Sequence, residues 1–186
     1  MNTLLSTRQS VLINDVRVFL EWRQISEGMD LNLWSSLTDG DKEIYSLIRN
    51  ENRKKEWSEG RRTLSQLPDD CLVTSLAHSD RWVVAAGVVT PVRGLGIDLE
   101  NQSREISDRL ARWIEHDERW TKNALDTWLV KEACFKADRA FNDELVLSDY
   151  AIVSTSKAQS KKGQPRAFSF QLYDNVAWRF AIALLD

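Results

Sequence analysis

The sequence is poor in the residues that disulfide-bonded, zinc-binding or membrane-spanning proteins need. Its 186 residues include two cysteines, two histidines and three prolines. The cysteines are far apart and form no CxxC motif, so we expect reduced thiols and no zinc site. The longest apolar runs, 82–89 and 180–185, are too short to cross a bilayer, so no membrane association is expected. The first residues show no signal-peptide pattern, which predicts a cytoplasmic protein.

The charge balance gives no excess of basic residues. There are 25 Lys and Arg residues against 28 Asp and Glu, a net charge of −3, so we expect no nucleic-acid partner. A hydrophobic share of 42% and a charged share of 28% are typical of an ordinary globular chain. Eight tryptophans predict a well-filled core.

Strand and helix patterns are mixed along the chain and do not alternate strictly. This mixture predicts an α+β protein of two similar-sized halves, 1–93 and 94–186, with a hinge at 91–94. A polar loop is expected over 157–166. Strands are predicted at 16–22, 71–77, 82–89, 95–100, 168–172 and 176–185, and helices at 40–48 (with Thr38 or Asp39 as its cap), 49–67, 103–120 and 121–140.

Two acidic residues lie on one side of the strand predicted at 95–100. Asp98 and Glu100 are two positions apart, so a strand points both side chains to the same face. Paired carboxylates suit a hard divalent cation such as Mg²⁺. The alternative is an acidic solvent face on an amphipathic strand.

The helix predicted at 121–140 carries a charged pair within its apolar stripe. On a helical wheel, Glu132 and Lys136 lie about 40° apart, within the arc that holds Leu125 and Leu129. Burying charges there is costly unless they pair or bind a ligand. A structural salt bridge between positions four apart is the alternative.

Two further groups suit a phosphate. His78 lies in a predicted turn with Ser75 and Ser79 nearby, which supplies a ring nitrogen and hydroxyls. Arg53 and Arg61 lie about 80° apart on the helix predicted at 49–67, where guanidinium groups could hold a phosphate. The alternatives are an ordinary hairpin turn and a solvated helix of mixed charge.

In this order the motifs resemble one family, the 4′-phosphopantetheinyl transferases. GIDLE followed by WLVKEACFKA resembles the two-part signature of that superfamily, and RKKEWSEGR and SLAHSDRW resemble the N-terminal half of its Sfp-like branch. The resemblance runs from about residue 37 to 185. It implies a monomer of two pseudo-twofold-related halves, each a small antiparallel sheet packed with helices, with coenzyme A bound between them. The implied reaction transfers phosphopantetheine to a serine of an apo acyl or peptidyl carrier protein and releases 3′,5′-ADP.

The resemblance also implies roles for the acidic residues and the lysine. Asp98, Glu100 and Glu132 would hold Mg²⁺ against the coenzyme A pyrophosphate. Lys136 would neutralise a phosphate oxygen, and Glu132 would act as the base for the serine proton.

The same resemblance assigns the coenzyme A phosphates to His78, Ser79, Arg53 and Arg61. Glu118, in IEHDER, resembles a further acidic motif of the branch, and the neighbouring Glu115 and Asp117 are alternatives for that position. The chain is a short variant: it lacks the Gly-Lys-Pro segment that helps longer relatives hold adenine, and it reads AHS where SHS is common.

Three other functions remain open from the sequence. The same acids could serve an Mg²⁺-dependent phosphohydrolase or a nuclease, or the fold could be a non-catalytic module that binds a carrier. A carrier surface is usually acidic, so a basic patch would suit it, and the candidates are Lys157, Lys161, Lys162 and Arg166.

Overall fold

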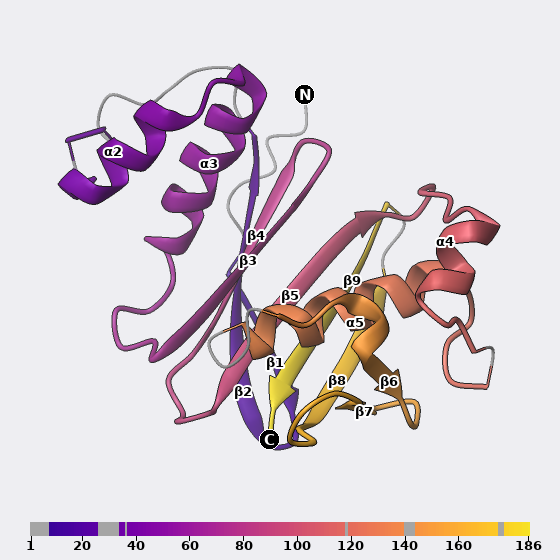
Figure 1. Ribbon diagram of the computed structural model, residues 1–186. Helices are drawn as coiled ribbons and strands as arrows, with labels where there is room; N and C mark the ends of the chain where they lie inside the picture. Colours follow the sequence, from indigo (N-terminus) through magenta and orange to yellow (C-terminus); the bar gives the residue numbers. More distant parts are fainter. Residues whose placement is uncertain (1–7, 26–33, 36, 118, 140–143, 175–176) are drawn as a thin grey trace.

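Two antiparallel sheets form the framework of the protein, and helices pack against both of them (Figure 1). The computed structural model describes residues 8–25, 34–35, 37–117, 119–139, 144–174 and 177–186. The two antiparallel sheets and the helices packed on them confirm the predicted α+β class. No helix in these ranges is long and apolar enough to cross a membrane.

The first sheet has four strands in the order β1-β2-β4-β3. Its β1–β2 hairpin was not predicted, and it turns at Asn14 and Asp15, which both adopt positive φ. Asn and Asp tolerate this conformation well, and it matches the twist of a two-residue hairpin. The bounds are β1 Gln9–Ile13, β2 Val16–Gln24, β3 Val73–Ser79 and β4 Trp82–Val88.

Two helices between β2 and β3 lie beside the first sheet (Figure 1). Helix α2 (Asp39–Leu47) begins after Thr38, whose side chain accepts from the Asp41 amide, as predicted. Helix α3 (Glu51–Leu64) begins after Asn50, whose side chain accepts from the Arg53 amide. Both predicted helices are confirmed, since Ser/Thr/Asn caps satisfy the free amides of a first turn.

The second sheet has five strands in the order β5-β9-β8-β7-β6. Helix α5 (Ala124–Asp138) packs directly on β5 because Gly96 has no side chain: a Cβ there would overlap the carbonyl oxygen of Ala133. The terminal hairpin of β8 and β9 is confirmed. The strand bounds are β5 Gly94–Asn101, β6 Tyr150–Ile152, β7 Lys157–Ser160, β8 Ala167–Asp174 and β9 Trp178–Leu185, and a short 3₁₀ helix, η1, covers Leu147–Asp149.

The hydrophobic core has two parts. One part lies between α5 and the second sheet and includes Leu129 and Phe168. The other joins residues of both sheets, among them Leu20, Val84 and Ile182. The first sheet is built before residue 89 and the second from residue 94 onward, so each half contributes one sheet to a shared core.

Three sequence predictions need correction. Helix α4 (Asp108–Trp113) covers only part of the helix predicted at 103–120, because Ser107 caps it and Glu115, at positive φ, ends the helical path. The loop predicted at 157–166 contains β7, which pairs with β6 and β8. His78 and Ser79 end strand β3, and the turn itself is Asp80 and Arg81.

Candidate functional site

Most of the predicted site residues, with Arg61 as an exception, meet where the end of β3, strand β5 and helix α5 come together. Strand β3 supplies His78 and Ser79, β5 supplies Asp98 and Glu100, and α5 supplies its two charged residues. Beside them is a cavity of about 500 Å³, lined by His78, Ser79, Asp80, Glu100, Asn101, Ser103 and Arg104. The cavity lies between the two sheets, so neither half forms it alone.

Asp98 and Lys136 form the centre of this site. Lys136 Nζ donates to Asp98 Oδ1 at 2.7 Å and to the Ile97 carbonyl at 3.0 Å. Asp98 is 7% exposed, and burial raises the pKa of its carboxyl although Lys136 opposes the shift. Its other oxygen, Oδ2, is buried and has no hydrogen-bond partner among the residues that the structure describes. A buried carboxylate oxygen without a partner is costly, and it marks a place where a ligand would fit.

Glu132 lies within electrostatic reach of Asp98. Burial raises the pKa of Glu132, and the negative charge of Asp98 raises it further, whereas Lys136 and Arg104 lower it. Two carboxylates whose charges disfavour each other are stabilised by a cation between them. The predicted apolar stripe needs correction: the most deeply buried residues of α5 include Ala133 and Ala137 on a neighbouring arc, and Glu132 is half-buried at its edge.

Glu100 is held by a different set of partners. Its carboxylate pairs with Arg104 and accepts from Ser79 Oγ at 2.9 Å. Arg104 also lies over the ring of Trp128, 4.9 Å from its centroid. The sequence analysis did not identify Arg104. Glu100 and Arg104 are only four positions apart, but the chain between them is a turn and not a helix, so their pairing depends on the path of that turn.

His78 connects helix α3 to this site. Arg53 donates to His78 Nε2 at 2.9 Å and to Glu56 at 2.9 Å. Burial lowers the pKa of His78, Glu56 opposes that shift, and the charges of Lys136 and Asp98 also act on the ring. Arg53 and His78 thus lie together.

Arg61 and Ser75 have other partners. Arg61 pairs with Asp41 of α2 at 2.9 Å and lies over the Trp57 ring, 5.2 Å from its centroid. Within the described ranges, these contacts hold Arg61 against α2 and not beside His78. Ser75 Oγ accepts from the Ile97 amide at 3.1 Å and so joins β3 to β5.

The fit of the site to Mg²⁺ is partial. Within the described part of the chain, no three His, Cys, Asp or Glu side chains are grouped to hold a metal ion. The structure therefore does not bring Asp98, Glu100 and Glu132 together as three ligands, since Arg104 and Ser79 occupy Glu100. Mg²⁺ commonly binds one or two carboxylates and completes its shell with water and substrate phosphates. Asp98 with Glu132 satisfies that requirement.

Most of the basic residues considered as a surface for an acidic carrier form ion pairs within the protein. Lys157 pairs with Asp186 at 3.0 Å, Lys161 pairs with Glu115, and Arg166 pairs with the buried Asp138 at 2.6 Å.

The remaining acidic candidates lie apart from this site. Glu115 forms an ion pair with Lys161. Asp117 forms an ion pair with Arg119, which lowers the pKa of Asp117 to about 2. Glu118, the residue resembling a further acidic motif, lies outside the described residues.

Comparison with protein-family models finds none that matches the chain, and comparison with curated proteins finds no match either. The assignment of function below therefore depends on the residues and their geometry.

Proposed function

We propose that this protein is a 4′-phosphopantetheinyl transferase. It would transfer the phosphopantetheine arm of coenzyme A to a serine of an apo acyl or peptidyl carrier protein, with Mg²⁺ as cofactor and 3′,5′-ADP as the second product. The observation that carries the proposal is the meeting of Asp98, Glu132 and Lys136, from the two separate parts of the signature. Their neighbours Glu100 and His78 line a cavity between the sheets. The two-sheet architecture, with one sheet and its helices in each half, supports the corresponding pseudo-twofold fold.

The reaction needs a base for the serine and a neutralised leaving group. A bond forms between the serine Oγ and the phosphorus that carries the pantetheine arm, and the bond from that phosphorus to the bridging oxygen breaks. The serine proton would pass to the carboxylate of Glu132, directly or through a water. The bridging oxygen leaves with its electron pair on 3′,5′-ADP, and Lys136 neutralises its charge.

Two carboxylates are available for the metal. Asp98, through its free Oδ2, and Glu132 would hold Mg²⁺. When bound, the metal supplies charge neutralisation to the pyrophosphate oxygens. Glu100 becomes a third ligand only when it leaves Arg104 and Ser79.

The coenzyme A phosphates would bind at the end of β3. Arg53 and His78 are in contact, and the hydroxyl of Ser79 faces the same cavity. Arg53 offers a fixed fork of donors that suits a phosphate. Arg61 would join them only after leaving Asp41.

Intact mass spectrometry of apo carrier proteins tests the proposal. A panel of acyl and peptidyl carriers is incubated with the protein, coenzyme A and Mg²⁺. We expect one carrier serine to gain one phosphopantetheine, and Glu132→Gln to lower the rate at least about 100-fold through loss of the base. Glu105→Gln, at an exposed position outside the site, is the matched control and should transfer at the normal rate.

Two results would contradict the proposal. Release of 3′,5′-ADP from coenzyme A without any carrier would identify an Mg²⁺-dependent phosphohydrolase. Coenzyme A binding without transfer to any carrier in the panel would favour a non-catalytic carrier-binding module.

A further inference from the structure

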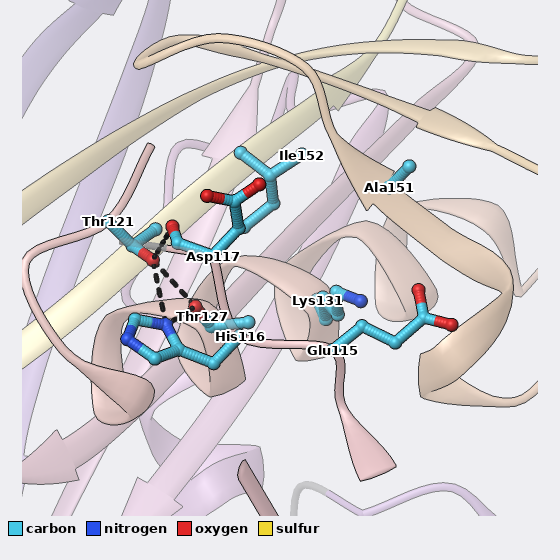
Figure 2. Close-up of a pocket in the computed structure, with 8 residues that line it drawn as sticks. All are labelled: Glu115, His116, Asp117, Thr121, Thr127, Lys131, Ala151 and Ile152. Atoms are coloured by element: carbon cyan, nitrogen blue, oxygen red, sulfur yellow. Dashed lines mark hydrogen bonds between the residues drawn. The ribbon is translucent and has the colours of Figure 1, made fainter. Parts of the chain in front are cut away.

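A second cavity, of about 570 Å³, lies on another face of helix α5 (Figure 2). Its walls are the loop after α4, the residues Thr127 and Lys131 of α5, and strand β6. On the helical wheel, the mean direction of Thr127 and Lys131 lies about 140° from the mean direction of Glu132 and Lys136. The transferase proposal makes no use of this cavity.

Lys131 is a buried charge that lines the cavity without a partner. The residue is 2% exposed, and its ammonium group forms no hydrogen bond or ion pair with any residue that the structure describes. The nearby Glu115 carboxylate is paired with Lys161. Burial of the side chain lowers the pKa of Lys131 to about 8 and the charge of Glu115 only partly opposes this shift, so an occupant that supplies a negative charge would stabilise the ammonium form.

Hydroxyl and ring donors lie at the other side of the cavity (Figure 2). His116 Nδ1 is 2.8 Å from Thr127 Oγ1 and 3.2 Å from Thr121 Oγ1, and the two hydroxyl oxygens are 2.6 Å apart. Hydroxyl protons can rotate toward a bound acceptor. Ala151 and Ile152 of β6 add an apolar wall.

The charges around the cavity select a singly charged ligand. Its two acids, Glu115 and Asp117, are already paired with Lys161 and Arg119. Lys131 therefore remains as one uncompensated positive charge. A phosphate dianion would need a second uncompensated cation to balance its charge.

We propose that this cavity binds a small monocarboxylate, with its carboxylate on Lys131 and its short apolar body against Ala151 and Ile152. The site is separate from the one proposed for coenzyme A. Its occupancy therefore does not depend on whether the protein is a transferase.

Isothermal titration calorimetry of the full chain tests this proposal with three small probes in a carboxylate-free and phosphate-free buffer. Propionate is the probe, propionamide is its uncharged counterpart of the same shape, and inorganic phosphate represents a dianion. We expect saturable binding of propionate and at least roughly tenfold weaker binding of the other two, because each lacks a matching charge.

Variants connect the binding to the cavity. Lys131→Met should weaken propionate at least roughly tenfold, whereas Lys122→Met, at an exposed lysine outside α5, should leave it unchanged. Thr127→Val keeps the shape and Lys131 but removes a hydroxyl, so we expect a several-fold loss. If Lys131→Met does not fold, the Thr127→Val result decides. Glu132→Gln should bind propionate normally, which separates this test from that of the transferase.

The proposal is overturned if the unmodified protein shows no saturable binding of propionate. It is equally overturned if phosphate or propionamide binds as well as propionate does, or if folded Lys131→Met, or Thr127→Val in its place, retains full affinity.

Discussion

At the scale of single residues, the candidate site consists of charges that the fold has taken out of water. One carboxylate oxygen of Asp98 accepts a hydrogen bond from Lys136. The other forms no hydrogen bond with any residue that the structure describes. Glu132 shares the same electrostatic environment. The free energy of ionising either carboxyl therefore depends on the charge of the other. A substitution at one of the two residues is expected to change the pKa of the other.

Lys136→Met should destabilise the protein in a pH-dependent way. Asp98 loses its cation, so its pKa in the folded protein rises further above the unfolded value of about 3.9. The folded state then binds the proton more tightly, and stability falls as pH rises through the folded pKa. We expect a loss of about 2–4 kcal/mol at pH 8 and a smaller loss at pH 5, measured by urea unfolding with tryptophan fluorescence.

The double variant Asp98→Asn/Lys136→Met is the control for this prediction, since it should remove the pH dependence. Equal losses of stability at pH 5 and pH 8 for Lys136→Met would show that the pKa of Asp98 does not depend on Lys136.

The two thiols should differ in reactivity. Both cysteines are free, as predicted, and burial raises the pKa of each thiol, most strongly at the fully buried Cys134. Because the thiolate is the reactive form, maleimide at pH 7 should label Cys71 slowly and leave Cys134 unlabelled until urea unfolds the chain. Peptide mass spectrometry measures this. Labelling of native Cys134 at the rate of Cys71 would contradict the packing of α5.

At the scale of elements, the contact between α5 and β5 positions the site. Gly96→Ala would force a Cβ into the Ala133 carbonyl, so α5 must move away from β5. We expect a loss of more than about 2 kcal/mol in thermal or urea unfolding, together with reduced carrier modification, since Glu132 and Lys136 move with the helix. Gly40→Ala in α2 meets its nearest atom at 4.0 Å and should leave stability and activity close to normal. An unchanged unfolding midpoint for Gly96→Ala would mean that the helix is not packed so closely.

Elements with strong periodic patterns could be predicted from the sequence. The strand at 16–22 and the helix at 49–67 both exist, since alternation and capping are local signals. Strand β7 could not be predicted, because its polar sequence becomes a strand only through pairing with β6 and β8 on both sides. The helix predicted at 103–120 was too long because the turn at Glu115 gives no periodic signal.

At the scale of the whole molecule, the two halves share one core. Aromatic contacts join the sheets: Trp22 lies 5.1 Å from Phe180, and Trp82 lies 6.2 Å from Trp178, between ring centroids. We expect a single cooperative unfolding transition, with tryptophan fluorescence and circular dichroism giving the same midpoint.

A fragment of residues 94–186 should not fold by itself, because it would expose the face that packs on the first sheet. Circular dichroism and urea unfolding of the fragment, with the full chain as control, test this. A cooperative transition in the fragment would show two independent domains. The monomeric state expected from the resemblance stays a prediction, and light scattering would test it.

The sequence by itself determined the α+β class, most helices and strands, and which charged residues lie near one another along the chain. These depend on periodicity, capping and motif order, which are local properties. Only the tertiary structure decided that Glu100 accepts a hydrogen bond from Ser79, that Arg61 pairs with Asp41, and that Lys131 is buried beside a cavity. Those outcomes depend on which distant side chains the packing of sheets and helices brings within a few ångströms, and burial then sets the cost of every unpaired charge.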